Sequence, residues 1–135
     1  VDQWTLCGWE VASASATITN VDSNPSTSTS PTQNLLSAPA STSLTFGTLY
    51  MSGDIDGATP GSGFTELLEV VPGSVSNSYQ VQYRGSSTSS SVSWSGASTS
   101  NIAIVLEVTA APETGMPPSL LMRRRIMPSP VFLED

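Results

Sequence analysis

Residues 79–108, YQVQYRGSSTSSSVSWSGASTSNIAIVLEV, contain three short runs in which every second side chain is large and apolar or aromatic. These side chains are Tyr79, Val81 and Tyr83, then Val92 and Trp94, then Ile102, Ile104, Leu106 and Val108. Alternate side chains of an extended strand point to opposite faces, so a period of two predicts three strands with one buried face each. Tyr79, Tyr83 and Trp94 are accordingly expected to face the core.

The same alternation recurs earlier in the chain. Residues 1–21 are expected to form one bent strand or two strands, and residues 44–51 form another strand in which Gly47 shifts the phase. Residues 64–71 could be a strand or a short helix, and their β-branched end favours a strand. Residues 22–43 and 52–63 are rich in Pro, Ser, Gly and Asp and are expected to be loops, with Leu35 and Leu36 pinning the first of them to the body.

These elements together predict an all-β protein. Many short strands, turn-forming residues between them and no clear helix are typical of an antiparallel β-sandwich. We expect a jelly-roll-like sandwich of about seven or eight strands over residues 1–108, and an extended C-terminal tail over residues 109–135.

Composition narrows the classes of function. Of the 135 residues, only 11% are charged, against about 25% in an average protein, and the net charge is −7. Residues 1–115 contain a single basic side chain, Arg84, so this acidic body is not expected to bind nucleic acid. No stretch is long and apolar enough for a membrane span, and no membrane partner is expected.

Enzymatic activity is not expected. The chain has no His and no Lys, so neither a Ser–His nor a Ser–Lys nucleophile can be assembled. The only cysteine, Cys7, lacks a His partner for the same reason and is expected to be buried and inert. Two close carboxylate pairs, Asp54 with Asp56 and Glu66 with Glu69, could act as acid and base, but solvated surface acids are the favoured interpretation.

Two weaker binding sites are considered. Asp54 and Asp56 lie in GDIDG, which resembles the opening of a calcium loop, but the twelfth position holds Thr65 instead of Glu. A plain acidic turn is favoured over Ca²⁺, and no cofactor is expected. Trp4 and Trp9 are candidates for stacking on a host glycan, because exposed aromatic rings are a common means of binding sugars.

The C-terminal tail contains an Arg triplet, five prolines and several apolar pairs. It has no amphipathic period, yet it is too apolar for a freely solvated linker. We expect it to bind a partner, and we favour an assembly contact over nucleic acid for the arginines. The predicted partner-binding residues are Leu120, Leu121, Arg123, Arg124, Arg125, Ile126, Val131 and Phe132.

Several short motifs within residues 44–108 resemble a β-sandwich domain of bacteriophage virion structural proteins, such as tail fibres, minor tail proteins and head decorations. The motifs are Pro60 followed by Gly63-Phe64-Thr65-Glu66-Leu67, then Tyr83-Arg84, then Ser93-Trp94-Ser95, and the apolar strand from Ile102 to Val108. The resemblance implies a non-enzymatic structural protein of the extracellular phage particle, which assembles with other virion proteins and copies of itself through sheet edges and the C-terminal tail. The alternative is an extracellular carbohydrate-binding or adhesive module.

Overall fold

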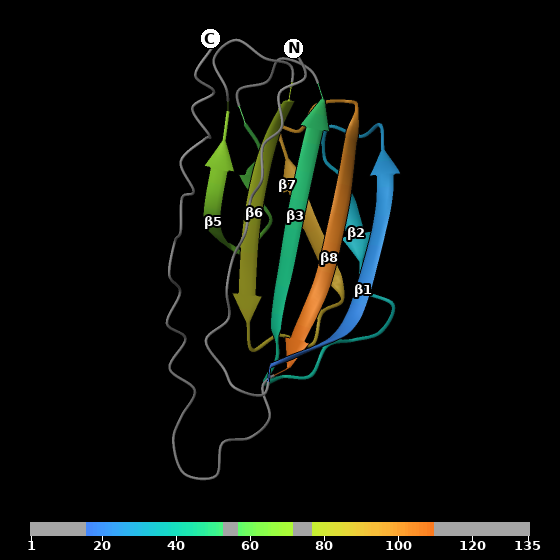
Figure 1. Cartoon of the computed structure of the whole chain (residues 1–135), viewed down its shortest axis with the longest axis vertical. Helices are drawn as coiled ribbons and strands as arrows, with labels where there is room; N and C mark the ends of the chain where they lie inside the picture. Colours follow the sequence, from blue (N-terminus) through green and yellow to red (C-terminus); the bar gives the residue numbers. More distant parts are fainter. Residues whose placement is uncertain (1–15, 53–56, 72–76, 110–135) are drawn as a thin grey trace, which may run out of the picture.

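The computed structural model describes residues 16–52, 57–71 and 77–109, and every regular element in these ranges is a β-strand (Figure 1). The strands are β1 (Thr17–Ser26), β2 (Thr32–Asn34), β3 (Leu44–Ser52), β4 (Thr59–Pro60), β5 (Thr65–Val70), β6 (Asn77–Gly85), β7 (Ser91–Ser95) and β8 (Asn101–Thr109). The prediction of an all-β protein with about seven or eight strands is confirmed. Residues 64–71 contribute a strand, as their β-branched end indicated.

The strands form two antiparallel sheets, one of five strands in the order β1-β8-β3-β6-β5 and one of three in the order β2-β7-β4. Figure 1 looks onto the five-stranded sheet, with β2 and β7 behind it. Successive strands pass from one sheet to the other, except that β5 and β6 are neighbours in the larger sheet. This alternation gives the jelly-roll-like sandwich that the sequence predicts.

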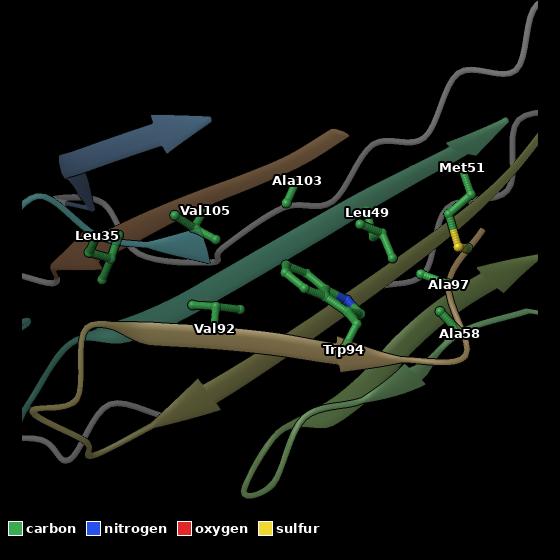
Figure 2. Packing of buried hydrophobic residues seen from close by; sticks show 9 residues of the cluster. All are labelled: Leu35, Leu49, Met51, Ala58, Val92, Trp94, Ala97, Ala103 and Val105. Carbon is green, nitrogen blue, oxygen red and sulfur yellow. The ribbon is translucent and has the colours of Figure 1, made fainter. Parts of the chain in front are cut away.

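The apolar core lies between the two sheets (Figure 2). Trp94 and Val92 extend from β7 toward the larger sheet, where they meet side chains of β3 and β8. The core cluster consists of Leu35, Leu49, Met51, Ala58, Val92, Trp94, Ala97, Ala103 and Val105. Three of these nine residues are alanines, so the large indole of Trp94 is accommodated by small neighbours.

The predicted orientation of β6 is wrong. Gln80 and Gln82 are fully buried between the sheets, whereas Tyr79 and Tyr83 point to the opposite side and are half-buried. The glutamines are tolerated there because they form hydrogen bonds across the core. The Trp94 indole N–H donates to Gln80 Oε1 at 2.6 Å, and the Gln82 amide both donates to the Ser93 carbonyl and accepts from the Gly61 N–H, each at 3.0 Å.

The same inversion occurs in β8. Its small and medium residues Ala103 and Val105 enter the core, while Ile102 and Ile104 point away from it and remain exposed. In β3 the expected change of phase at Gly47 does not occur, because Gly47, Leu49 and Met51 all point inward. Gly47 is required instead because a Cβ there would lie 2.6 Å from Val92 Cγ1 and 2.7 Å from Trp94 Cζ2.

The region expected to be one long loop, residues 22–43, contains the second half of β1 and all of β2. Pro25 is tolerated within β1 because β1 is an edge strand. On the side of β1 that faces away from β8 there is no neighbouring strand, so a missing backbone donor costs the sheet no hydrogen bond there. Leu35 enters the core as expected, but Leu36 is largely exposed. The region 52–63 likewise contains the short strand β4.

Candidate functional site

The two faces of the five-stranded sheet differ in charge. The charged side chains in the described ranges are Asp22, Glu66, Glu69, Arg84 and Glu107. All of them lie on the side of the sheet that faces the smaller sheet. The first four are each opposite a residue of the neighbouring strand that points to that side, and Glu107 is itself buried on it. Asp22, for example, lies opposite Val105 and accepts a hydrogen bond from Gln33 of β2, while Glu69 accepts one from the Ala58 N–H. The opposite side of the sheet therefore carries no charge within the part of the chain that the structure describes.

We call this opposite side of the sheet the outer face. It is predominantly apolar and aromatic, and Figure 1 shows that none of the described strands lies in front of it. Its apolar members are Ile18, Val21 and Pro25 of β1, Ile102, Ile104, Leu106 and Val108 of β8, Leu44, Phe46 and Tyr50 of β3, Tyr79, Val81 and Tyr83 of β6, and Leu68 and Val70 of β5. A sheet with two apolar faces is typical of one that is covered on both sides.

One part of the outer face is an exposed aliphatic stripe, which consists of Ile18 and Val21 on β1 and Ile102 and Ile104 on β8. These four side chains retain between 43% and 56% of their accessible surface. Single exposed aliphatic residues are ordinary, but these four lie on two paired strands of one sheet face, and clusters of exposed apolar side chains mark interaction sites.

The other part of the outer face is aromatic. The rings of Phe46 and Tyr83 stack with centroids 6.2 Å apart, and those of Tyr50 and Tyr79 lie 5.2 Å apart at 54°. At the end of this face, Tyr50 also borders an open depression of about 450 Å³. Its lining residues are Pro25, Ser26, Thr27, Tyr50, Thr99, Ser100, Asn101 and Ile102.

Among the described residues, Glu107 is the buried carboxylate. Burial raises the pKa of its carboxyl, but the hydrogen bonds that it accepts, including one from the Ala40 N–H at 2.9 Å, lower the pKa by more than burial raises it. The folded state therefore favours the ionised form of the carboxyl. The hydrogen bond from Ala40 to Glu107 also connects the loop after β2 to the end of β8.

Replacing Glu107 by Gln is expected to destabilise the protein by about 1–3 kcal/mol at neutral pH, because an amide NH₂ would face buried donors. Since the folded pKa is depressed, this stabilisation is present above the unfolded pKa and is lost as the pH falls through the folded pKa. Urea denaturation over a series of decreasing pH should show the difference in stability between the wild type and the variant shrinking as the pH falls.

The exposed Glu66→Gln serves as the control, with an expected change within about 0.5 kcal/mol. A Glu107→Gln protein as stable as the wild type at neutral pH would contradict the role given to this carboxylate.

The two members of the carboxylate pair Glu66 and Glu69 have different surroundings. Glu66 is exposed at the edge strand β5, and Glu69 holds the Ala58 backbone N–H at 2.8 Å. Within the described ranges no group of three or more His, Cys, Asp or Glu side chains could hold a metal ion. No helix in those ranges has the length and apolar character to cross a membrane.

Most sequence-predicted site residues lie outside the described residues. These are the calcium candidates Asp54 and Asp56, the glycan candidates Trp4 and Trp9, Cys7, and the tail residues Leu120, Leu121, Arg123, Arg124, Arg125, Ile126, Val131 and Phe132. Their roles stay predictions. The outer face was not among the predicted sites, although a signal existed: Ile102, Ile104 and Leu106 alternate with Ala103 and Val105, so both faces of β8 are apolar.

No protein-family model, curated protein or solved structure shows significant similarity to the chain. The fold thus defines an all-β sandwich, and the resemblance to phage virion domains stays a prediction.

Proposed function

We infer that this chain is a non-enzymatic structural protein of a bacteriophage particle, which assembles with copies of itself and with other virion proteins. The observation that carries the assembly role is the outer face, which has no charged side chain among the described residues and includes the exposed aliphatic stripe. The phage assignment is supported by the motif resemblance described above.

Charge favours the outer face as the contact between copies. The chain has a net charge of −7, so two copies repel each other over most orientations. The described acidic side chains lie on the other side of the sheet, so the outer face is where two copies can approach without opposing like charges. Burial of the aliphatic stripe then stabilises the contact between copies, by about 25 cal/mol for each Å² of apolar surface that is buried.

Sheet edges give less support for assembly than the face does. β1 has a register irregularity between Ile18 and Asn20 and contains Pro25, and β5 has an irregularity between Glu66 and Leu68. The outer strands of the smaller sheet are only three and two residues long. Short, bulged and proline-containing edges discourage strand pairing between chains, so we assign the main contact to the outer face, with the C-terminal tail as a second contact.

The double variant Ile102→Ser, Ile104→Ser is expected to weaken self-association at least about tenfold, since two exposed aliphatic side chains leave the contact. Sedimentation equilibrium of the full chain over a concentration series measures this. Leu36→Ser is the matched control, because it removes a highly exposed aliphatic side chain outside the outer face. Equal association of all three proteins, or a wild type that is monomeric throughout the series, would contradict the assembly role.

The phage assignment has its own test. Antibodies against the folded domain should decorate intact particles in negative-stain images, and particles that carry no label would exclude a virion location.

A carbohydrate-binding module is the second candidate, and the depression beside Tyr50 favours it. An aromatic ring bordered by Thr27, Ser100 and Asn101 offers stacking together with hydrogen-bonding groups, which is the chemistry of many sugar sites. A glycan array probed with the wild type and with Tyr50→Ala tests it: binding that Tyr50→Ala removes would support this candidate, and no binding would exclude it.

A further inference from the structure

Three residues of the outer face are buried even though no described strand covers them. Phe46 and Val81 keep only 1% and 2% of their accessible surface, and Val108 keeps 4%, yet all three point away from the smaller sheet. Neighbours within a single sheet shield the sides of a side chain and leave its tip accessible. Burial this complete therefore requires a covering segment.

The three buried residues follow a path across the sheet. Val108 of β8 pairs with Ile18 at the start of β1 and with Leu44 at the start of β3. Phe46 lies two residues further along β3, and Val81 of β6 lies opposite Thr48, two residues further again. The path thus starts where the chain enters β1 and runs diagonally over β8, β3 and β6 (Figure 1).

We propose that residues 1–15 of the same chain dock along this path and cover the aromatic part of the outer face. This segment joins β1 at the start of the path, since Thr17 is paired with Thr109 directly beside the pair Ile18 and Val108. Fifteen extended residues span about 50 Å, and a nine-residue strand is only about 30 Å long, so the segment can cross the sheet. The segment is placed over the aromatic part of the outer face, so the aliphatic stripe is left for the contact between copies that we propose.

The composition of residues 1–15 suits this surface. Trp4, Leu6 and Trp9 supply large apolar groups to an uncharged face that presents the rings of Phe46, Tyr79 and Tyr83. Aromatic pairs add about 0.5–1.5 kcal/mol beyond the burial of their area. Residues 1–15 carry only two charged side chains, Asp2 and Glu10. Residues 110–135 begin at the same end of the sheet, but they carry six charged side chains and five prolines, and the described part of the face offers no acidic partner for their three arginines.

Cysteine cross-linking in the full chain tests the proposal. Cys7 is the only native cysteine, so a single added cysteine defines one possible intrachain link. Thr48→Cys places a thiol beside the path on the outer face, and Ser89→Cys places one in the exposed loop before β7 as the matched control. A short bis-maleimide should give an intrachain link in Thr48→Cys with about tenfold higher yield than in Ser89→Cys, because docking raises the effective concentration of the two thiols.

A second outer-face variant keeps the test decisive if Thr48→Cys does not fold. Thr65→Cys lies on β5 opposite Tyr83, is exposed, and should also cross-link to Cys7 above the Ser89→Cys level. Mass spectrometry of the digested monomer and dimer bands distinguishes links within a chain from links between chains. Equal yields in the outer-face and control variants would overturn the proposal, and links found between chains would overturn it by assigning the face to a second copy.

Discussion

Trp94→Ala is expected to lower the free energy of unfolding by about 3–5 kcal/mol, the usual cost of truncating a large buried aromatic residue. Trp94 is 2% exposed and belongs to the core cluster between the sheets, where it extends from β7 toward β3 (Figure 2). Its neighbours Ala58, Ala97 and Ala103 are too small to fill the cavity that the indole would leave. A loss of this size is a large fraction of the stability of an ordinary domain.

The Trp94 indole also donates a hydrogen bond to the buried side-chain amide of Gln80. Trp94 Nε1 donates to Gln80 Oε1, and Gln80 Nε2 has no hydrogen-bond partner in the part of the chain that the structure describes. Trp94→Phe retains most of the ring volume but leaves both ends of that amide unsatisfied, at a cost of about 1–3 kcal/mol. Adding Gln80→Leu should recover part of this loss, because an apolar group of similar shape needs no partner.

Urea denaturation of Trp94→Ala, Trp94→Phe and the double variant Trp94→Phe, Gln80→Leu separates the cavity from the hydrogen bond. If Trp94→Ala were no less stable than Trp94→Phe, the cavity argument would fail. If the double variant were less stable than Trp94→Phe alone, the amide would have a partner in addition to the indole.

The Gln80–Trp94 hydrogen bond also shows why the sequence predicted the strands and the buried face of β7 correctly, but the buried faces of β6 and β8 incorrectly. A period of two identifies an extended strand, but it does not say which of the two faces meets the other sheet. In β6 the tyrosines are the largest side chains, so the sequence alone places them in the core. The choice was instead decided by Trp94, fourteen positions later in the chain, whose N–H needs an acceptor inside the sandwich.

β8 shows the same limit. Ile102 and Ile104 are larger than Ala103 and Val105, but the space opposite β8 is already occupied by the residues of β7 and the loop after β2. Small residues fit there, so the larger ones face outward. Packing between strands that are distant in sequence decides this, and a local pattern contains no information about it.

The candidate site was harder to predict than the fold for a related reason. The outer face is a property of five strands from four parts of the chain, and its lack of charge emerges only when their registers are known. The sequence predicted an assembly protein and placed the contacts at sheet edges and in the tail. The irregular registers of β1 and β5 could not be foreseen, because a bulge depends on the partner strand as well as on the strand itself.

Gly47→Val is expected to destabilise the sandwich by about 3 kcal/mol, near the upper end of the usual cost of overpacking a core. Gly47 lies in the middle of the central strand β3 and faces β7. A Cβ at this position would approach Val92 Cγ1 to 2.6 Å and Trp94 Cζ2 to 2.7 Å, well inside van der Waals contact. Neither neighbour can move freely, because both are fully buried and Trp94 is also held by its hydrogen bond to Gln80.

Gly85→Val at the end of β6 is the matched control. A Cβ there meets only the flexible end of Leu44 at 3.4 Å, and Gly85 is exposed. Neither glycine has a positive φ, so backbone strain does not distinguish the two sites, and valine has a higher strand propensity than glycine at both. Thermal and urea unfolding should therefore show a large loss for Gly47→Val and almost none for Gly85→Val. Equal stabilities of the two variants would mean that the sheets can move apart at β3, and the close packing of Trp94 against Gly47 would have to be abandoned.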